Sequence, residues 1–216
     1  MSAVAGAAHP YIATLLRGCE PARDRHAWLA ERRASALERA NALTVPTTRD
    51  EEWRFTDISP LTRMPLVRAG DGARPQTGEI ARLMVREAGI RLVFVDGMFA
   101  PGLSDCTGLP QGVVVTNLAA GLGALGSLLE QHLARHAAFE GDVFAALNTA
   151  HLSDGALVRV SRDVRSTSPV QLLFVATQKE AAIHPRCLIV VEDGAELTLI
   201  EDYAALTEGP YLSNAV

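Results

Sequence analysis

The sequence predicts an α+β protein in which a mainly helical part is followed by closely spaced strands. The segment 22–43 contains neither Gly nor Pro and carries apolar residues at helical spacing. Two later runs, Leu172–Ala176 and Cys187–Val191, are continuous and apolar, which is typical of strands buried on both faces. Other apolar runs in 157–216 follow without an intervening helix. This density favours stacked sheets or a β-solenoid over a βαβ fold.

Proline and capping residues set the expected helix ends in the first part. Pro46 ends the long helix. Thr48 and Glu51 have the spacing of a capping box, which predicts a short helix, and Ser59-Pro60 is expected to end it.

Trp53 and Phe55 lie on this short helix, and we expect both to anchor it against a neighbouring part of the molecule. Periodicity and turn residues predict the elements that follow. These are a helix at Glu79–Ala88, strands at Arg91–Val95 and Val113–Thr116, a helix at Ser127–His136 with a capping box from Ser127 to Glu130, a helix at Val143–Thr149 capped by Asp142, and strands at Leu157–Val160 and Tyr211–Val216.

Asp193-Gly194 separates two of the predicted strands and admits two interpretations. Asp-Gly between strands is a strong hairpin signal, because Gly tolerates the positive φ of a type I′ turn. It also suits a corner at which a solenoid chain passes from one sheet to the next. The segment Ala195–Tyr203 alternates like a half-exposed strand. We expect Leu188–Val191 and Leu197–Ile200 to lie on successive faces of a solenoid.

Composition and charge exclude several functional classes. The 216 residues carry a net charge of −5, and 48% of them are hydrophobic. No basic footprint for nucleic acid and no apolar run long enough to span a bilayer is present. The sequence shows no signal peptide, and its three scattered cysteines suggest a reducing compartment. We therefore expect a cytoplasmic protein.

A glycine run between Gly121 and Gly126 matches the dinucleotide fingerprint G-x-G-x-x-G. Asn117–Ala120 separates it from the preceding strand, whereas the fingerprint needs its glycines at the end of the strand. We expect a flexible glycine-rich connection there. The sequence also contains no P-loop, so the chain should neither hydrolyse ATP nor bind NAD.

Two further groups of residues are candidates for a metal site and for a catalytic site. His184 and Cys187 could start an iron, zinc or persulfide site, but two ligands do not close one, and Cys187 has the pattern of a small buried apolar residue. Four acids could supply the carboxylate pair of a glycosidase, although solvent-facing acids on a sheet edge fit the pattern better. They are Glu192, Glu196, Glu201 and Asp202. No catalytic, cofactor-binding or metal residue is therefore predicted.

Four blocks in order carry a resemblance to a known family. They are EEWRFTDISPL at 51–61, LVFVDGMFAPGLSD at 92–105, ALNTAHLSDGALVRV at 146–160, and HPRCLIVVEDGAELTLIEDY at 184–203 followed by YLSNAV. Together they resemble the SufB/SufD family of the SUF iron–sulfur cluster assembly system, and SufD more than SufB. The first block followed by LVFVDG carries that preference.

The resemblance implies a helical N-terminal domain, expected at 1–150, and the start of a right-handed parallel β-helix, expected at 151–216. It implies a non-catalytic scaffold that acts with SufB and the ATPase SufC, with an iron–sulfur cluster held transiently by the complex. The chain stops at Val216, part-way into the expected β-helix. The family's partner-binding regions and functional His and Cys positions are therefore expected to be missing, and self-association through an open β-helix end is expected. The alternatives are a carbohydrate-active β-helix enzyme and a small iron or sulfur carrier.

Overall fold

Three sheets form the β part of the computed structural model, which describes residues 9–21, 25–70 and 72–216. Sheet A has the order β1 (Val67–Arg68), β7 (Ala181–Ile183), β10 (Tyr211–Ser213). Sheet B has the order β3 (Met98–Phe99), β2 (Ile90–Val95), β6 (Val170–Ala176), β9 (Leu199–Ala205). Sheet C has the order β4 (Val113–Asn117), β5 (Ala156–Val160), β8 (Cys187–Val191).

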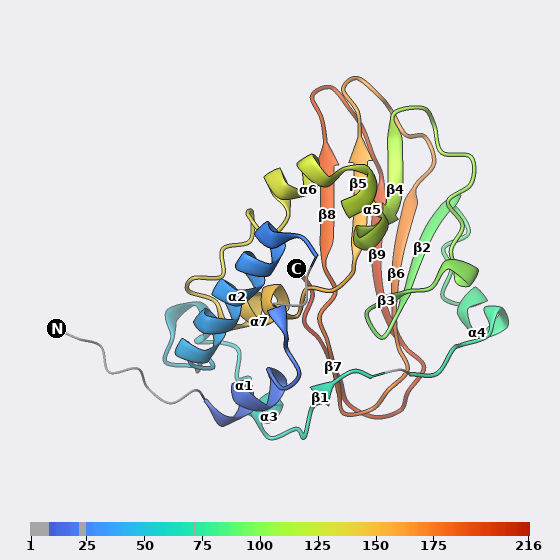
Figure 1. Cartoon of the computed structure of the whole chain (residues 1–216). Coiled ribbons are helices and arrows are strands. Elements are labelled where there is room, and N and C mark those ends of the chain that lie inside the picture. The colour runs from blue at the N-terminus through green and yellow to red at the C-terminus, as the bar shows by residue number, and fades with distance from the viewer. Residues whose placement is uncertain (1–8, 22–24, 71) are drawn as a thin grey trace.

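The last six strands visit the three sheets twice in the same order. The first round, β5, β6 and β7, enters sheets C, B and A in turn, and the second round, β8, β9 and β10, repeats that path (Figure 1). Each second-round strand pairs in parallel with its first-round counterpart. The paired positions 156 and 187, 170 and 199, and 181 and 211 lie 31, 29 and 30 residues apart.

The turn at Asp193-Gly194 leads from sheet C to sheet B. The strands on either side of it pair with β5 and β6 and not with each other, so the hairpin interpretation is wrong and the placement on successive sheets is confirmed. Gly194 has a φ of +70°, and a Cβ there would clash with the carboxylate of Asp163 in the turn of the first round. Glycine is therefore required at this corner, because the backbone has a positive φ and because Asp163 leaves no room for a Cβ.

An aliphatic and aromatic core fills the space between sheets B and C. It contains Leu92 and Leu172 from sheet B and Val158 from sheet C, all with no exposed surface. Phe94 and Phe174 occupy one register position on β2 and β6, and their rings stack 5.0 Å apart. Aligned side chains of this kind stabilise neighbouring strands beyond the area that they bury.

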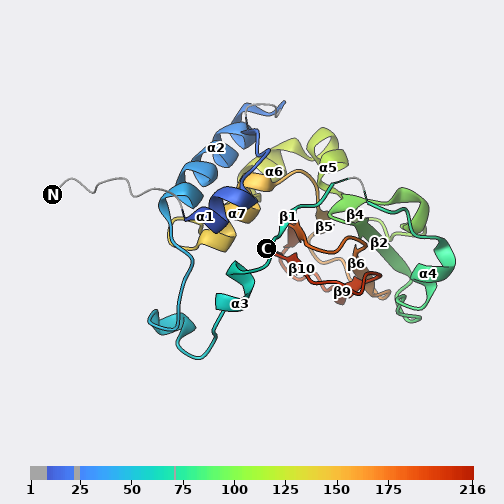
Figure 2. The ribbon, with the colours of Figure 1, turned by 90° about the horizontal axis from the view of Figure 1, so that it is seen from below.

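Helices cover the outer faces of the sheets (Figures 1 and 2). They are α1 (Pro10–Leu15), α2 (Ala27–Ala42), α3 (Ser59–Thr62), α4 (Thr77–Ala81), α5 (Leu118–Ala124), α6 (Gly126–His132) and α7 (Val143–His151), with 3₁₀ helices η2 (Glu51–Trp53) and η3 (Pro101–Leu103). Helices α1, α2 and α7 share a core that reaches Ala182 of sheet A. Helices α5 and α6 contribute leucines that pack with Leu157 and Leu188 of sheet C, and Ile80 of α4 packs with Leu173 of sheet B. Among the described residues, no helix is long and apolar enough to cross a membrane.

Strands from the first 150 residues join the same sheets. β1 pairs in parallel with β7, β2 in parallel with β6, and β4 antiparallel with β5. Each first-round strand therefore lies between two neighbours, one from the N-terminal part and one from the second round. Strand pairs thus connect the two parts of the chain on either side of the predicted domain boundary at residue 150.

Several local predictions for residues 46–64 are wrong. Thr48 does not cap η2; instead, Asp50 accepts a hydrogen bond from the backbone N–H of Thr47 at 2.7 Å. Ser59-Pro60 begins α3 and does not end a helix, because Pro at a first helical position loses no intrahelical hydrogen bond. Trp53 is an anchor as predicted, with its ring 5.9 Å from that of Phe144, but Phe55 is 87% exposed.

The other helix predictions are confirmed in part. Asp142 caps α7, accepting hydrogen bonds from the N–H groups of Phe144 and Ala145. The helix predicted at Glu79–Ala88 is the shorter α4, and no side chain caps α6, so the capping box from Ser127 is wrong. The predicted start of the long helix at 22–24 lies outside the described residues, and α2 begins at Ala27.

The strand Cys187–Val191 is not buried on both faces, contrary to the prediction. Ile189 is 39% exposed and Val191 is 44% exposed. The strand is β8, at one edge of sheet C, so its inward-facing side chains have neighbours on β5 but none on the other side among the described residues. An apolar run therefore predicts a strand that can be buried, but the position of the strand in the sheet determines how much of it is buried.

Candidate functional site

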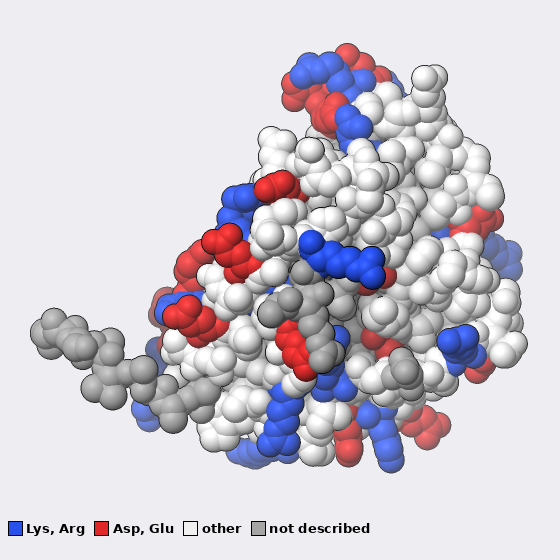
Figure 3. Space-filling model, in the orientation of Figure 1, with Lys and Arg blue, Asp and Glu red and all other residues white. Residues whose placement is uncertain are grey.

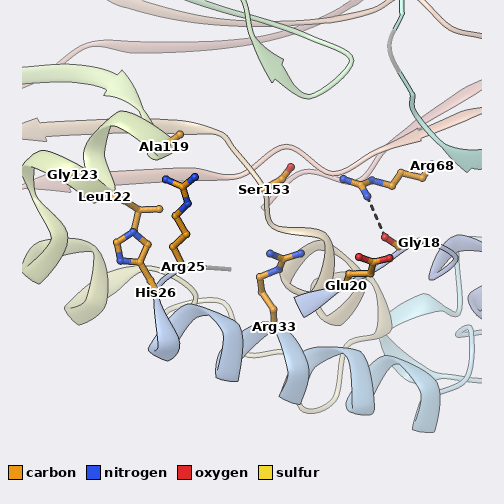
Figure 4. Close-up of a pocket in the computed structure, with 10 residues that line it drawn as sticks. All are labelled: Gly18, Glu20, Arg25, His26, Arg33, Arg68, Ala119, Leu122, Gly123 and Ser153. Carbon is orange, nitrogen blue, oxygen red and sulfur yellow. Dashed lines mark hydrogen bonds between the residues drawn. The ribbon is translucent and has the colours of Figure 1, made fainter. Parts of the chain in front are cut away.

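A basic hollow lies where the helices meet the sheets (Figure 4). Its volume of about 640 Å³ is within the range of small-molecule sites. Residues from several distant segments line it: Gly18, Glu20, Arg25, His26, Arg33, Arg68, Ala119, Leu122, Gly123 and Ser153. The hollow therefore exists only in the folded chain.

Helix α2, the segment that precedes it, and strand β1 place the arginines of the hollow. Arg25 precedes α2, Arg33 lies within α2, and Arg68 ends β1. Figure 4 shows their side chains reaching into the hollow from different sides. The Nε–H of Arg33 donates to the carbonyl of Ala150 at 3.2 Å, and Nη1 of Arg68 donates to the carbonyl of Gly18 at 3.4 Å. These bonds tether two of the guanidinium groups to the backbone.

Positive charge dominates the lining. Among the described lining residues, Glu20 is the one acid, against Arg25, Arg33 and Arg68. The nearby thiol of Cys19 donates to the carbonyl of Ala150 at 3.1 Å. Burial raises the pKa of this thiol, although the positive charges of Arg33 and Arg68 oppose that rise. Cys19 is therefore a protonated, structural group, and the arginines supply the chemistry of the hollow.

A second hollow of about 330 Å³ adjoins the basic one and shares Arg68 and Ser153 with it. His151 and His184 line it, and their rings stack 4.6 Å apart with 16° between their planes. Burial lowers the pKa of His151 to about 4. Burial, together with the charges of His151 and Arg68, lowers the pKa of His184 to about 3. Both imidazoles are therefore neutral at pH 7.

Hydrogen bonds fix the tautomer of each ring. Nε2 of His151 lies 2.8 Å from the carbonyl of Leu15, so this nitrogen carries the proton. Nδ1 of His184 lies 3.1 Å from the side-chain nitrogen of Asn214, a donor, so Nδ1 of His184 accepts and its proton is on Nε2. The remaining nitrogens, Nδ1 of His151 and Nε2 of His184, are buried without a partner among the described residues. Through these two hydrogen bonds, the stacked rings connect the last residue of α1 with the segment that follows β10.

The structure does not bring His184 and Cys187 together with a third metal ligand. The thiol of Cys187 lies 3.6 Å from Oε1 of Glu201 and packs against the core between sheets B and C, while His184 turns toward His151. Burial and the negative charge of Glu201 raise the pKa of the Cys187 thiol. Within residues 9–21, 25–70 and 72–216, no group of three His, Cys, Asp or Glu side chains is arranged to hold a metal ion.

Comparison with known proteins identifies the family. Residues 22–172 match the family described as "SufBD protein N-terminal region". The chain belongs to the SufBD family. This match includes Arg25, Arg33, Arg68 and Ser153 of the basic hollow.

Three relatives show how far the similarity extends. An iron–sulfur cluster assembly SufBD family protein of Synechocystis is 33% identical over 87% of this chain and 44% of its own length. The SufD proteins of Escherichia coli and Bacillus subtilis are 26% and 28% identical over 79% and 82% of this chain, and over 38% and 41% of their own lengths. This SufBD chain therefore spans less than half the length of these relatives.

The four acids considered for a glycosidase pair do not share one cleft. Glu192 pairs with Arg159 and Glu196 with Arg165, so both link the first round to the second. Asp202 accepts a hydrogen bond from Gln171 at 2.7 Å, and Glu201 accepts one from the hydroxyl of Tyr203. Each acid thus has a partner of its own within the sheets and turns.

The glycine run from Gly121 to Gly126 is helical, so the predicted flexible connection is wrong. Gly121 and Gly123 lie within α5, and Gly126 begins α6. A Cβ on Gly121 would lie 2.5 Å from Cδ2 of Leu157, whereas a Cβ on Gly123 would meet open space. Gly121 therefore allows α5 to pack closely on sheet C, which accounts for that glycine without a nucleotide.

The arginines of the basic hollow were missed by analysis of the sequence. Arg25 and Arg33 lie before and within α2, Arg68 lies on β1, and nothing in the sequence marks Arg68 as a neighbour of the other two. No motif signal could have found them, because the tertiary packing of α2 and β1 brings them together.

Proposed function

We propose that this chain is part of a non-catalytic scaffold in a SUF-type iron–sulfur cluster assembly complex. The observation that carries the proposal is the match of residues 22–172 to the N-terminal region of the SufBD family. The names of the Synechocystis, E. coli and B. subtilis relatives all describe iron–sulfur cluster assembly. The iron–sulfur cluster is cargo of the complex in this proposal.

We also propose that the two rounds of strands are the first coils of a right-handed parallel β-helix. Support comes from the repeated visits to sheets C, B and A and from the parallel pairing of the rounds at a spacing of about 30 residues. The interior stack from Phe94 to Phe174 continues to Tyr203 of the second round, with 5.2 Å between the last two rings. Such a solenoid offers a rigid, extended surface to partner subunits.

SufB and the ATPase SufC are the proposed partners. An affinity tag on the protein in its own cells tests this. We expect a SufB-like protein and a SufC-like ATPase to co-purify with the tagged protein, and deletion of its gene to lower the activity of iron–sulfur enzymes. A cytoplasmic protein of unrelated function with the same tag is the control. Recovery of neither partner, in cells whose iron–sulfur enzymes survive the deletion, would contradict the proposal.

The exposed side of the second round is a proposed contact surface for a second copy of the isolated chain. Ile189, Val191 and Tyr203 are each about 40% exposed there. Unpaired strand edges with apolar neighbours promote association. We expect light scattering to show self-association that Val191→Lys reduces, with Val67→Lys, at an exposed valine of sheet A, as the matched control. A chain that stays monomeric at all concentrations would refute this surface.

A further inference from the structure

We propose that the basic hollow binds the phosphate groups of a soluble small molecule, with Arg25 and Arg68 as the principal ligands. This goes beyond the scaffold function, which needs no small molecule at this place. The inference rests on the number, origin and hydrogen bonding of the arginines around one concave site.

The guanidinium groups of Arg25 and Arg68 have hydrogen-bonding capacity to spare. Among the described residues, Arg25 has no hydrogen-bond or ion-pair partner, and Arg68 donates only to the carbonyl of Gly18. A guanidinium group carries five N–H donors in a planar fork that matches two oxygens of a phosphate. Since Arg33 and Glu20 have partners of their own, we assign the principal contacts to the other two arginines.

The arrangement favours a polyvalent anion. Three guanidinium groups reach one hollow from different sides, and Glu20 offsets one of the three charges. A monovalent anion would gain little from such a site, whereas a diphosphate can contact two arginines at once through charge-assisted hydrogen bonds. The hydroxyl of Ser153, also on the lining, can donate a further hydrogen bond.

The surroundings favour a small molecule over a nucleic acid or a membrane. The chain has a net charge of −5, and the face in Figure 3 carries charged side chains of both signs interspersed with uncharged surface. Extended anionic partners bind to broad basic surfaces. A volume of about 640 Å³ instead suits a ligand of ordinary metabolite size.

The glycine run contributes space to this site. Gly123 of α5 lines the hollow, and a Cβ added there would meet no atom within 4 Å. In a dinucleotide-binding fold, by contrast, a glycine is required so that the backbone can come close to the pyrophosphate. The proposed site does not require such a close approach at Gly123. The proposed contacts come from the guanidinium groups of arginine side chains, whereas that motif binds phosphate with backbone N–H groups.

Calorimetric titration of the whole chain with inorganic pyrophosphate tests the proposal. We expect saturable binding at one site that weakens as salt is raised. Arg25→Gln and Arg68→Gln should each weaken binding about tenfold or more, since each removes charged hydrogen bonds. Both side chains are exposed, so we expect the variants to keep the thermal unfolding midpoint of the parent.

Arg86→Gln is the matched control, because Arg86 is also exposed and lines neither hollow. It should leave pyrophosphate binding unchanged. Absence of saturation up to about 10 mM pyrophosphate, or an equal loss in Arg86→Gln, would overturn the proposal. Citrate is expected to bind more weakly than pyrophosphate, and equal affinity would overturn the assignment to phosphate.

Vesicles that contain phosphatidic acid separate the two sources of a phosphate group. We expect the chain not to sediment with them. Sedimentation that Arg25→Gln abolishes would overturn the assignment to a soluble molecule and place a lipid headgroup in the hollow.

Discussion

The two rounds of strands follow the same path through the three sheets and differ sharply in burial. In the first round, β6 and β7 are buried throughout, and one residue of β5 is partly exposed. In the second round, β8, β9 and β10 have a single buried residue between them, Leu188. The alternation of β9, with Glu201 and Asp202, accounts for part of this difference, but β8 is as apolar as β5 and is still the more exposed of the two.

Neighbouring strands explain it. Each first-round strand lies between a strand of the N-terminal part and a strand of the second round. Each second-round strand has a described neighbour on one side only. Burial in this fold therefore depends on a strand's position in the stack, and the β1, β2 and β4 strands are what bury the first round. The strands of the N-terminal part thus form one covering layer over the first round.

Removal of core side chains should distinguish the two rounds most strongly. Leu172→Ala in the first round should lower the free energy of unfolding by roughly 2–5 kcal/mol, because Leu172 is fully buried and a cavity would remain. Ile189→Ala in the second round should cost less than about 1.5 kcal/mol, since water already reaches 39% of Ile189. Urea unfolding measures both.

Both substitutions remove the same three carbon atoms, so a simple count of lost atoms predicts equal losses. Equal losses for Leu172→Ala and Ile189→Ala would mean that the two rounds are buried alike in solution. That result would place another segment or another copy of the chain over β8.

Sequence analysis predicted five of the six strands of the two rounds and missed β7. It predicted the burial of β6 correctly and that of β8 wrongly. The apolar runs around Leu172 and Leu188 are strong local signals, and Gly194 marks the corner through its backbone requirement. The exposure of Ile189 depends on sheet order, which no local pattern encodes. The basic hollow was invisible for the same reason, since Arg25 and Arg68 are neighbours only after folding.

Acid should loosen the junction between the rounds and the helices. The pKa of His151 is lowered to about 4 by burial, and its ordinary value is 6.5. The unfolded chain therefore takes up a proton on this group below pH 6.5, while the folded chain resists it until about pH 4. The contribution of His151 to the free energy of unfolding is therefore fully present above pH 6.5. It is lost as the pH falls from 6.5 to about 4, and the loss amounts to about 3 kcal/mol.

The slope of stability against pH between about 6.5 and 4 is the measurement, because it does not depend on the absolute stability of a variant. His151→Leu should flatten this slope even though it also removes the hydrogen bond to the carbonyl of Leu15. The exposed His136, changed to Gln, serves as the matched control and should keep the parent slope. An unchanged slope in His151→Leu would show that the imidazole is already protonated in the folded chain.

Two glycines on α5 should respond in opposite directions. Gly121→Ala would press a Cβ against Leu157 of the first round and should lower stability by about 1–2 kcal/mol, after the gain in helix propensity. Gly123→Ala faces open space and should raise stability by up to about 1 kcal/mol. Thermal unfolding of the two variants compares the packed and unpacked sides of one helix. Stabilisation by both would mean that α5 does not pack closely on sheet C.

The smallest expected effects come from three ion pairs that join the first round to the second. Arg159 pairs with Glu192 at 2.6 Å, Arg162 with Asp193 at 2.6 Å, and Arg165 with Glu196 at 3.3 Å. The side chains of the first pair are about one-third exposed and those of the last are 71% and 62% exposed. Water weakens an exposed pair more, and holding two long side chains together costs entropy.

Double-mutant cycles on the first and last pairs measure this gradient. The coupling between Arg159 and Glu192 should exceed that between Arg165 and Glu196, because Nε and Nη2 of Arg159 both donate to the same carboxylate oxygen. These hydrogen bonds, with one from the backbone of Arg162, hold the pKa of Glu192 below its usual range. The coupling should therefore persist above the ordinary pKa of a glutamate and fade as pH falls through the lowered value. High salt should remove the coupling of the exposed pair first. Equal couplings for the two pairs would show that the pair at Arg165 is no more open to water than the pair at Arg159.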